Sequence, residues 1–131
     1  MLKINWADLD LFGHVNNVAF FKYIQAARVN YCELIGLTSL FDLSKNSFMV
    51  ASSQCEYKSP MHYPGEVSVL CRVDWIKNTS MQLLYELYNS ENILVAKAMD
   101  VLVVYDHSKK IKVSISSQLK SEIMKIEKRG F

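Results

Sequence analysis

The apolar residues change their spacing once along the chain, and this change restricts the possible fold more than any other feature. From Asn16 to Gly36 they recur at steps of three and four residues, which predicts one long helix with a wide apolar face. From residue 66 to residue 105 they alternate with period two or fill both faces, which predicts strands. Because each pattern leaves an apolar face to bury, helix and strands can cover one another. We therefore expect an α+β domain in which an antiparallel sheet wraps around one helix.

Turn residues and shorter patterns predict the other elements. Polar turns at Lys77–Thr79 and Asn89–Asn92 predict antiparallel hairpins. The stretch 93–105 is apolar on both faces, apart from Lys97 and Asp100, and is expected inside the sheet. The expected elements are a short first strand, the long helix, strands at 47–58, 66–77, 80–89 and 93–105, and a C-terminal helix at 116–128. The sheet would thus have about five strands.

Four residues of the long helix have an expected local role. The side chain of Asn16 or of Asn17 can accept a hydrogen bond from the free N–H groups at the helix start, and Gly36 stands where the helix stops. Arg28 falls within the apolar face. Because a buried guanidinium needs a carboxylate or carbonyl partner, we interpret Arg28 as structural.

Composition limits the class of protein. The chain has 131 residues, which suits one domain over 1–131, and it is 50% hydrophobic and 21% charged, so disorder is not expected. Apolar runs such as Val101–Tyr105 are too short to span a bilayer, and the N-terminus does not resemble a signal peptide. The three widely spaced cysteines, Cys32, Cys55 and Cys71, form no CxxC pattern. They argue against a disulfide framework or a zinc site and favour a reducing, cytoplasmic location.

The charge is unevenly distributed. The net charge of +2 combines a slightly acidic segment 1–106 with a basic segment 107–131. The basic segment could meet an anionic ligand or partner, or it could be a solvated face. Because aromatic residues are not interleaved with its lysines, nucleic-acid binding is not expected.

The segment 6–17, WADLDLFGHVNN, gathers two carboxylates, a Gly, a His and two Asn just before the helix. One interpretation is a capping loop, because Asp and Asn bond to backbone groups in turns and Gly supplies a positive φ. The other is a catalytic site. The N–H groups at the helix start can hold a developing negative oxygen, and Asp10 could act beside them as nucleophile or as the base that activates water. Such a pair suits hydrolysis of an activated acyl group.

The motif also points to a known family. Its residues are Asp8, Asp10, Gly13, His14, Val15, Asn16 and Asn17, followed in the helix by Tyr23, Ala27 and Arg28. Together with the block Glu56–Pro60 and with Gly65–Glu66 at the start of a strand, they resemble the hotdog-fold acyl-CoA thioesterases, in the branch similar to 4-hydroxybenzoyl-CoA thioesterase. The resemblance implies the hotdog fold over nearly the whole chain.

The resemblance implies roles for the motif residues. Asp10 corresponds to the catalytic carboxylate, and the backbone N–H of Asn17 to the donor that polarises the thioester carbonyl. His14, Asn16 and Gly13 match motif positions and would shape the pocket, although His14 could equally be a loop residue with satisfied nitrogens. Asp8 is expected to be a structural cap.

The resemblance further implies an acyl-CoA substrate, no metal and no cofactor beyond the coenzyme A of the substrate. The family forms obligate dimers with active sites at the subunit interface, and dimers often pair into tetramers. Coenzyme A phosphates would lie near Lys58, or near Lys77 with Ser80, and each lysine could instead be merely solvated.

Two functions other than acyl-CoA hydrolysis stay open. The chain could be a non-catalytic hotdog protein that binds an acyl thioester or serves as an assembly subunit, or it could release acyl chains from an acyl carrier protein. A binder has no need for a carboxylate beside the helix start. The acyl group is not specified. The residues that could line an apolar tunnel are Phe20, Phe21, Tyr23, Phe48 and Met49, and the same residues could form the core.

Overall fold

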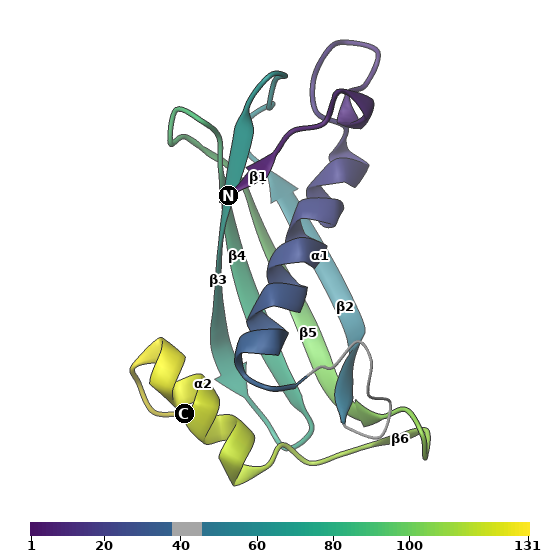
Figure 1. Ribbon diagram of the computed structural model, residues 1–131, viewed down its shortest axis with the longest axis vertical. Coiled ribbons are helices and arrows are strands. Elements are labelled where there is room, and N and C mark those ends of the chain that lie inside the picture. The colour runs from purple at the N-terminus through teal and green to yellow at the C-terminus, as the bar shows by residue number, and fades with distance from the viewer. Residues whose placement is uncertain (38–45) are drawn as a thin grey trace.

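The computed structural model describes residues 1–37 and 46–131 and shows an antiparallel sheet curled around one long helix (Figure 1). The elements are β1 (Leu2–Lys3), the 3-10 helix η1 (Trp6–Asp8), α1 (Asn17–Leu34), β2 (Ser47–Tyr57), β3 (Glu66–Ile76), β4 (Ser80–Tyr88), β5 (Leu94–Asp106), β6 (Ile111–Lys112) and α2 (Ser117–Glu127). The long helix, the four long strands and the C-terminal helix were all predicted, with bounds that differ by a residue or two. The short elements η1 and β6 were not predicted.

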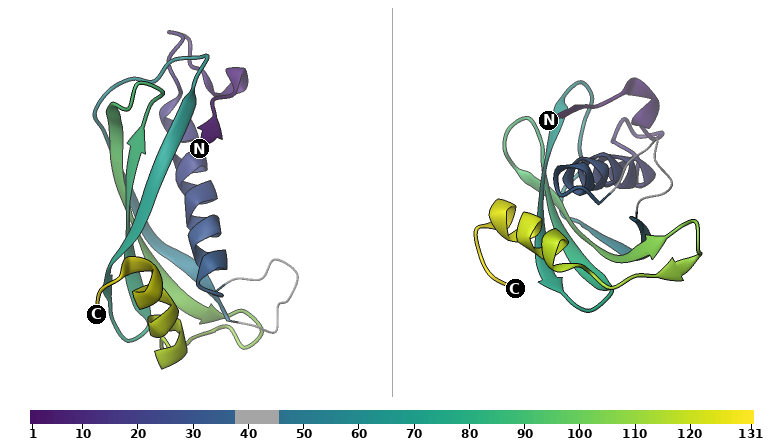
Figure 2. Two further views of the ribbon diagram at one scale, coloured as in Figure 1. Left: turned by 60° about the vertical axis from the view of Figure 1, so that its left-hand side comes forward. Right: turned by 60° about the horizontal axis from the view of Figure 1, so that its bottom comes forward.

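The sheet has the strand order β1-β3-β4-β5-β2, with β6 paired to the end of β5. All pairs are antiparallel, and β5 pairs with β4 on one side and with β2 on the other, so the prediction that 93–105 lies inside the sheet is confirmed. Viewed toward one end, the sheet bends around α1 (Figure 2). The strand β2 is left at the edge of the sheet.

The core lies between α1 and the concave face of the sheet. Alternate residues of β4 point into it, and they are Met81, Leu83, Tyr85 and Leu87. From α1 the buried residues include Phe20, Tyr23, Ile24, Tyr31 and Cys32. The predicted period-two pattern therefore identified the inner face of the sheet, and two of the possible tunnel residues, Phe20 and Tyr23, are buried in this core.

A capping hydrogen bond marks the start of α1, and a left-handed glycine follows its end. Asn16 is the N-cap, because its Oδ1 accepts from the N–H of Val18 at 2.9 Å, and Asn17 is the first helical residue. At the other end Gly36 has a φ of +75°, a left-handed conformation that glycine adopts without steric cost. The choice between Asn16 and Asn17 as the cap is thereby settled in favour of Asn16.

A buried ion pair joins α1 to the sheet. Nη1 of Arg28 lies 2.7 Å from Oδ2 of Asp100, whose side chain is 0% exposed. The same carboxylate accepts hydrogen bonds from the hydroxyl of Tyr85 at 2.7 Å and from Oγ of Ser53, which lies directly opposite Asp100 on β2, at 2.6 Å. This network connects α1 with β5, β4 and β2, and it confirms the structural interpretation of Arg28.

Two further sequence predictions concern cysteines and membrane spans. Cys32, Cys55 and Cys71 all lie in the described part of the chain and are free thiols. None of the helices in the described ranges combines the length and apolarity that crossing a membrane requires.

Removing the carboxylate of Asp100 is expected to destabilise the fold strongly. In Asp100→Ala the guanidinium of Arg28 keeps its burial and loses its charge partner, which typically costs about 3–5 kcal/mol. Urea unfolding at one fixed protein concentration measures the change. The matched control is Asp74→Ala, because Asp74 pairs with Arg72 at the surface, where such pairs contribute about 0–1 kcal/mol. Equal losses in the two variants would contradict the importance of the buried network.

Candidate active site

The loop that precedes α1 is a tight turn organised by Asp10. The N–H of Asp10 donates to the carbonyl of His14 at 2.7 Å, and Oδ1 of Asp10 accepts from the N–H groups of Phe12 and His14 at 2.8 and 3.1 Å. Gly13 has a φ of +78°, which the turn requires. The capping interpretation of this segment is thus correct for one oxygen of the carboxylate.

The second oxygen of Asp10 takes no part in the turn. Within residues 1–37 and 46–131, no group donates a hydrogen bond to Oδ2 of Asp10, and the side chain is exposed. The turn therefore holds the carboxylate by one oxygen and leaves the other available to a substrate or to water.

The start of α1 leaves one N–H group in a similar position. The N–H groups of Val18 and Ala19 donate to the side chain and the carbonyl of Asn16. Among the described residues, the N–H of Asn17 has no acceptor. Because the first N–H groups of a helix carry its positive dipole end, this donor suits an oxygen that gains negative charge.

These groups border one cleft of about 370 Å³ between the loop, the start of α1 and the segment that follows β2. Its lining consists of Asp10, His14, Val15, Asn17, Phe20, Tyr57, Lys58, Ser59 and Pro60. Four of the predicted site residues, Asp10, His14, Asn17 and Lys58, are thus brought together. Gly13 and Asn16 shape the same region through the turn and the cap.

Tyr57 forms a wall of this cleft and was not predicted as a site residue. Its ring packs edge-on against that of Phe20, with centroids 5.1 Å apart, and its hydroxyl donates to the carbonyl of Asn17 at 3.2 Å. Burial and the neighbouring Cys55 raise the pKa of Tyr57, which keeps the hydroxyl protonated and able to donate. Tyr57 belongs to the block Glu56–Pro60 that carries the family resemblance. An aromatic residue at the end of a strand is more typical of core packing, however, so the sequence alone predicted no site role for it.

His14 faces a second histidine across the loop. The rings of His14 and His62 meet edge-on with centroids 4.8 Å apart, and the two residues also form an isolated backbone bridge. The N–H of Val15 donates to the carbonyl of Met61 at 2.8 Å next to it. His14 is therefore both a packed loop residue and part of the cleft lining, while His62 lies too far along the sequence to be linked to the motif without the fold.

The predicted phosphate contacts separate into two groups. Lys58 lines the cleft, and its Nζ lies 2.6 Å from Oε1 of Glu56. Lys77 and Ser80 belong to the β3–β4 hairpin, at the end of the sheet near α2, whereas α1 begins at the opposite end (Figure 1). The intervening β3 strand has 11 residues, roughly 36 Å at about 3.3 Å per residue. Within one chain, Lys77 and Ser80 therefore do not reach the cleft.

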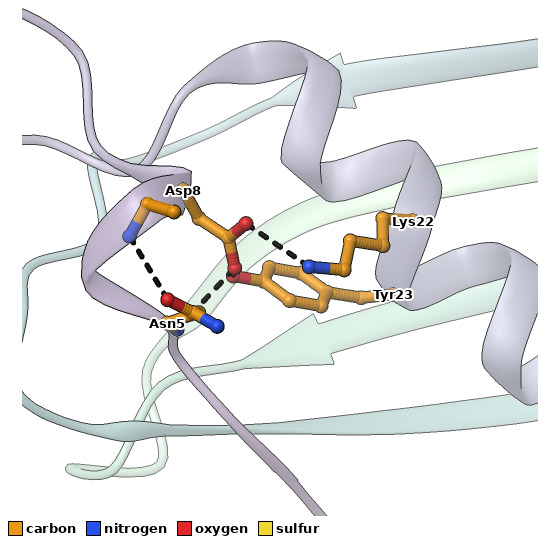
Figure 3. Close-up of polar contacts among 5 residues, drawn as sticks. Asn5, Asp8, Lys22 and Tyr23 are labelled. Carbon is orange, nitrogen blue, oxygen red and sulfur yellow. Dashed lines mark hydrogen bonds and ion pairs between the residues drawn. The ribbon is translucent and has the colours of Figure 1, made fainter.

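Asp8 does not line the cleft. Its side chain is 9% exposed and faces α1, where Oδ2 accepts from the hydroxyl of Tyr23 at 2.9 Å and Oδ1 from Nζ of Lys22 at 3.1 Å (Figure 3). Its oxygen also caps η1 by accepting from the N–H of Asn5 at 3.3 Å. In the part of the chain that the structure covers, no three His, Cys, Asp or Glu side chains gather closely enough to hold a metal ion.

Comparison with known proteins places this chain in a family. The sequence profile of the thioesterase-like superfamily matches residues 4–123. The uncharacterised protein YsmA of Bacillus subtilis (strain 168) is 26% identical over 84 residues, which are 64% of this chain and 56% of YsmA. The matched part of this chain thus spans little more than half of that curated relative.

Two solved structures agree over nearly their whole length. A thioesterase from Thermus thermophilus, complexed with coenzyme A and Zn, has a TM-score of 0.87 at 25% identity, with 99% of this chain and 93% of that chain covered. The PA2801 protein of Pseudomonas aeruginosa has a TM-score of 0.84 at 25% identity, with 93% and 94% covered. The likeness to hotdog-fold thioesterases predicted from the motif is confirmed for family and fold: the chain belongs to the thioesterase-like superfamily.

Proposed function

We propose that the protein hydrolyses the thioester bond of an acyl-coenzyme A to a free acid and coenzyme A. The observation that carries the proposal is the free Oδ2 of Asp10 together with the free N–H of Asn17 in one cleft of the described chain. Membership of the superfamily supports a thioester as the bond that is cleaved. The coenzyme A bound to the Thermus thermophilus thioesterase supports coenzyme A as the thiol.

The chemistry has two balanced routes. In one, Oδ2 of Asp10 attacks the thioester carbonyl, the C–S bond breaks, and water then hydrolyses the resulting anhydride. In the other, Oδ2 takes a proton from the water that attacks the same carbon. Either way the carbonyl oxygen gains negative charge, which the N–H of Asn17 stabilises, and the thiolate leaves and is protonated. Neither route needs a metal ion or a redox cofactor, and none is proposed.

The motif residues around this pair keep both groups available. Gly13 allows the turn in which backbone N–H groups hold only Oδ1 of Asp10. Asn16 accepts hydrogen bonds from the N–H groups of Val18 and Ala19. The N–H of Asn17 has no acceptor among the described residues. We assign His14 a role in shaping the cleft, since it lines the cleft and its N–H helps to hold Oδ1 of Asp10.

A second copy of the chain is proposed to complete the site. No residue of β2 is buried, and its outer edge pairs with no strand in the described ranges. Native proteins protect edge strands of this length, and pairing with another copy is one way. Apolar side chains are exposed beside the cleft as well, with Leu11 100% and Phe12 83% exposed. Lys77 and Ser80 could contact coenzyme A only from such a partner.

A dimer or a dimer of dimers in a reducing cytoplasm fits these features. The free thiols support that location, because secreted proteins usually oxidise theirs. The free Oδ2 of Asp10 favours hydrolysis over mere binding of an acyl thioester. Acyl carrier protein as the thiol donor is the remaining alternative, and assays with both thiols separate the two.

Asp10→Asn is expected to lose most of the hydrolysis. The amide cannot attack or accept a proton, and loss of a general base alone typically costs about 10²–10⁴ in kcat. Thiol release from a panel of acyl-CoAs measures the loss. The matched control is Asp106→Asn, because Asp106 accepts from N–H groups two and three residues ahead in an exposed turn far from the cleft. A folded Asp10→Asn variant with near-parental activity would refute the assignment.

Lys58→Ala is expected to raise KM a few-fold at low salt and to leave kcat unchanged. An exposed contact with a phosphate contributes little more than about 1 kcal/mol, and at about 1 M salt, where the Debye length is about 3 Å, the difference should largely disappear. Lys3→Ala on β1 provides the control, because Lys3 is an exposed lysine outside both the cleft and the basic segment 107–131. If KM is the same in both variants at low salt, Lys58 does not bind the phosphates.

Sedimentation at micromolar concentration is expected to show a dimer or larger. Met49→Glu, which places a charge on the exposed part of β2, should shift the equilibrium toward monomer. Ile111→Glu is the control, because Ile111 is a similarly exposed apolar residue on β6. A monomeric parent protein, or equal effects of the two changes, would exclude β2 as the interface.

A further inference from the structure

Asp8 lies at one end of the loop that precedes α1, residues 8–16, and contacts both the other end of this loop and the side of α1. Its carboxylate accepts hydrogen bonds from the hydroxyl of Tyr23 and from Nζ of Lys22 (Figure 3). Both donors lie one to two turns inside the helix. Its carbonyl accepts from the N–H of Asn16 at 2.6 Å, directly before the free N–H of Asn17. Two residues after Asp8 comes Asp10 itself. A single residue therefore borders both groups on which the proposed reaction depends.

The rest of the loop transmits this anchoring. Leu9 and Val15 form a backbone bridge, and in the next residue pair the N–H of Asp10 donates a hydrogen bond to the carbonyl of His14. The two arms of the loop are thus paired by backbone hydrogen bonds, and the pairing begins at Asp8 and Asn16. A shift of Asp8 relative to α1 would therefore move the carboxylate of Asp10 with respect to the N–H of Asn17.

The contacts of Asp8 require a carboxylate. Three donors converge on its two oxygens, namely the Tyr23 hydroxyl, the Lys22 ammonium and the N–H of Asn5, and an ionised carboxylate offers acceptors alone. Burial by itself would raise the pKa of Asp8, but the hydrogen bonds from these three groups outweigh it and lower the pKa below its ordinary value. Lys22 is 62% exposed, so solvent screens its share, and Tyr23 is the buried donor.

We propose that Asp8 and Tyr23 form a positioning pair that fixes the carboxylate of Asp10 relative to the oxyanion donor at Asn17. The proposal rests on the proposed function for its kinetic consequence, but the anchoring itself can be measured without catalysis. Neither residue touches the substrate in this assignment. Both act through the loop, and their effect is expected on the chemical step rather than on substrate affinity.

Tyr23→Phe is the test, because it removes one hydroxyl and keeps the buried ring. The expected result is a fall in kcat of about 10- to 100-fold with KM changed less than about twofold, since displacements near 1 Å can cost about 10² in rate. The matched control is Tyr31→Phe. Tyr31 is equally buried near the C-terminal end of the same helix, and it donates to Oε2 of Glu127, the last residue of α2. It should lose comparable stability but keep kcat.

The pH profile gives a readout that simple destabilisation would not move. A lowered pKa keeps Asp8 ionised, so its contribution is present above the ordinary pKa and is lost as pH falls through the lowered one. Without the Tyr23 hydroxyl, burial still raises the pKa and one opposing bond is gone. The acid-side loss of kcat in Tyr23→Phe should therefore begin at a higher pH than in the parent. An acid-side loss that begins at the same pH in Tyr23→Phe as in the control Tyr31→Phe would contradict the proposal.

Hydrogen exchange separates failure of this proposal from failure of the proposed function. Amides of residues 9–17, followed by mass spectrometry, should exchange about tenfold or more faster in Tyr23→Phe than in the parent or in Tyr31→Phe. Faster exchange supports the positioning pair even if no acyl-CoA is hydrolysed, in which case only the proposed function fails. Unchanged exchange, or unchanged kcat in an active protein, would overturn it.

Discussion

The position of α1 on the sheet depends on the ion pair between Arg28 and Asp100. Apolar packing between a helix and a sheet is non-directional and would tolerate several offsets. A buried charge is different, because leaving it unpaired is far more costly than a slightly imperfect apolar contact. The carboxylate of Asp100 is satisfied only where Arg28 of α1, Tyr85 of β4 and Ser53 of β2 all reach it. All three reach it at the observed placement of the helix.

That placement determines what stands beside the start of α1. With the helix fixed, its first residue lies against the end of β2, where Tyr57 bonds to the carbonyl of Asn17 and packs on Phe20. The loop before the helix closes the third side of the cleft. The proposed catalytic groups are therefore a consequence of core packing as much as of the motif that contains them.

Asp10 and Asp106 illustrate how little the local turn decides. Both use one carboxylate oxygen to accept from backbone N–H groups a few residues ahead. The turn around Asp106 joins β5 to β6. The one around Asp10 leads into the N-terminus of an 18-residue helix whose first N–H is unused by the described residues. The chemical role proposed for Asp10 therefore comes from the surroundings of its turn and not from the turn itself.

The sequence by itself determined the features that arise from short-range spacing. Alternation with period two identified the inner face of β4. Gly13, the pair Asn16–Asn17 and Gly36 marked the turn and the helix ends, because side-chain-to-backbone bonds and allowed φ values depend on neighbours in the chain. The motif also placed Asp10 close to Asn17. Only the tertiary structure brought Tyr57 to the cleft and His62 against His14, paired Asp8 with Tyr23, and separated Lys77 from Lys58. Those relations join residues far apart in sequence, and they exist only once burial of the helix and pairing of its charges have fixed its place in the sheet.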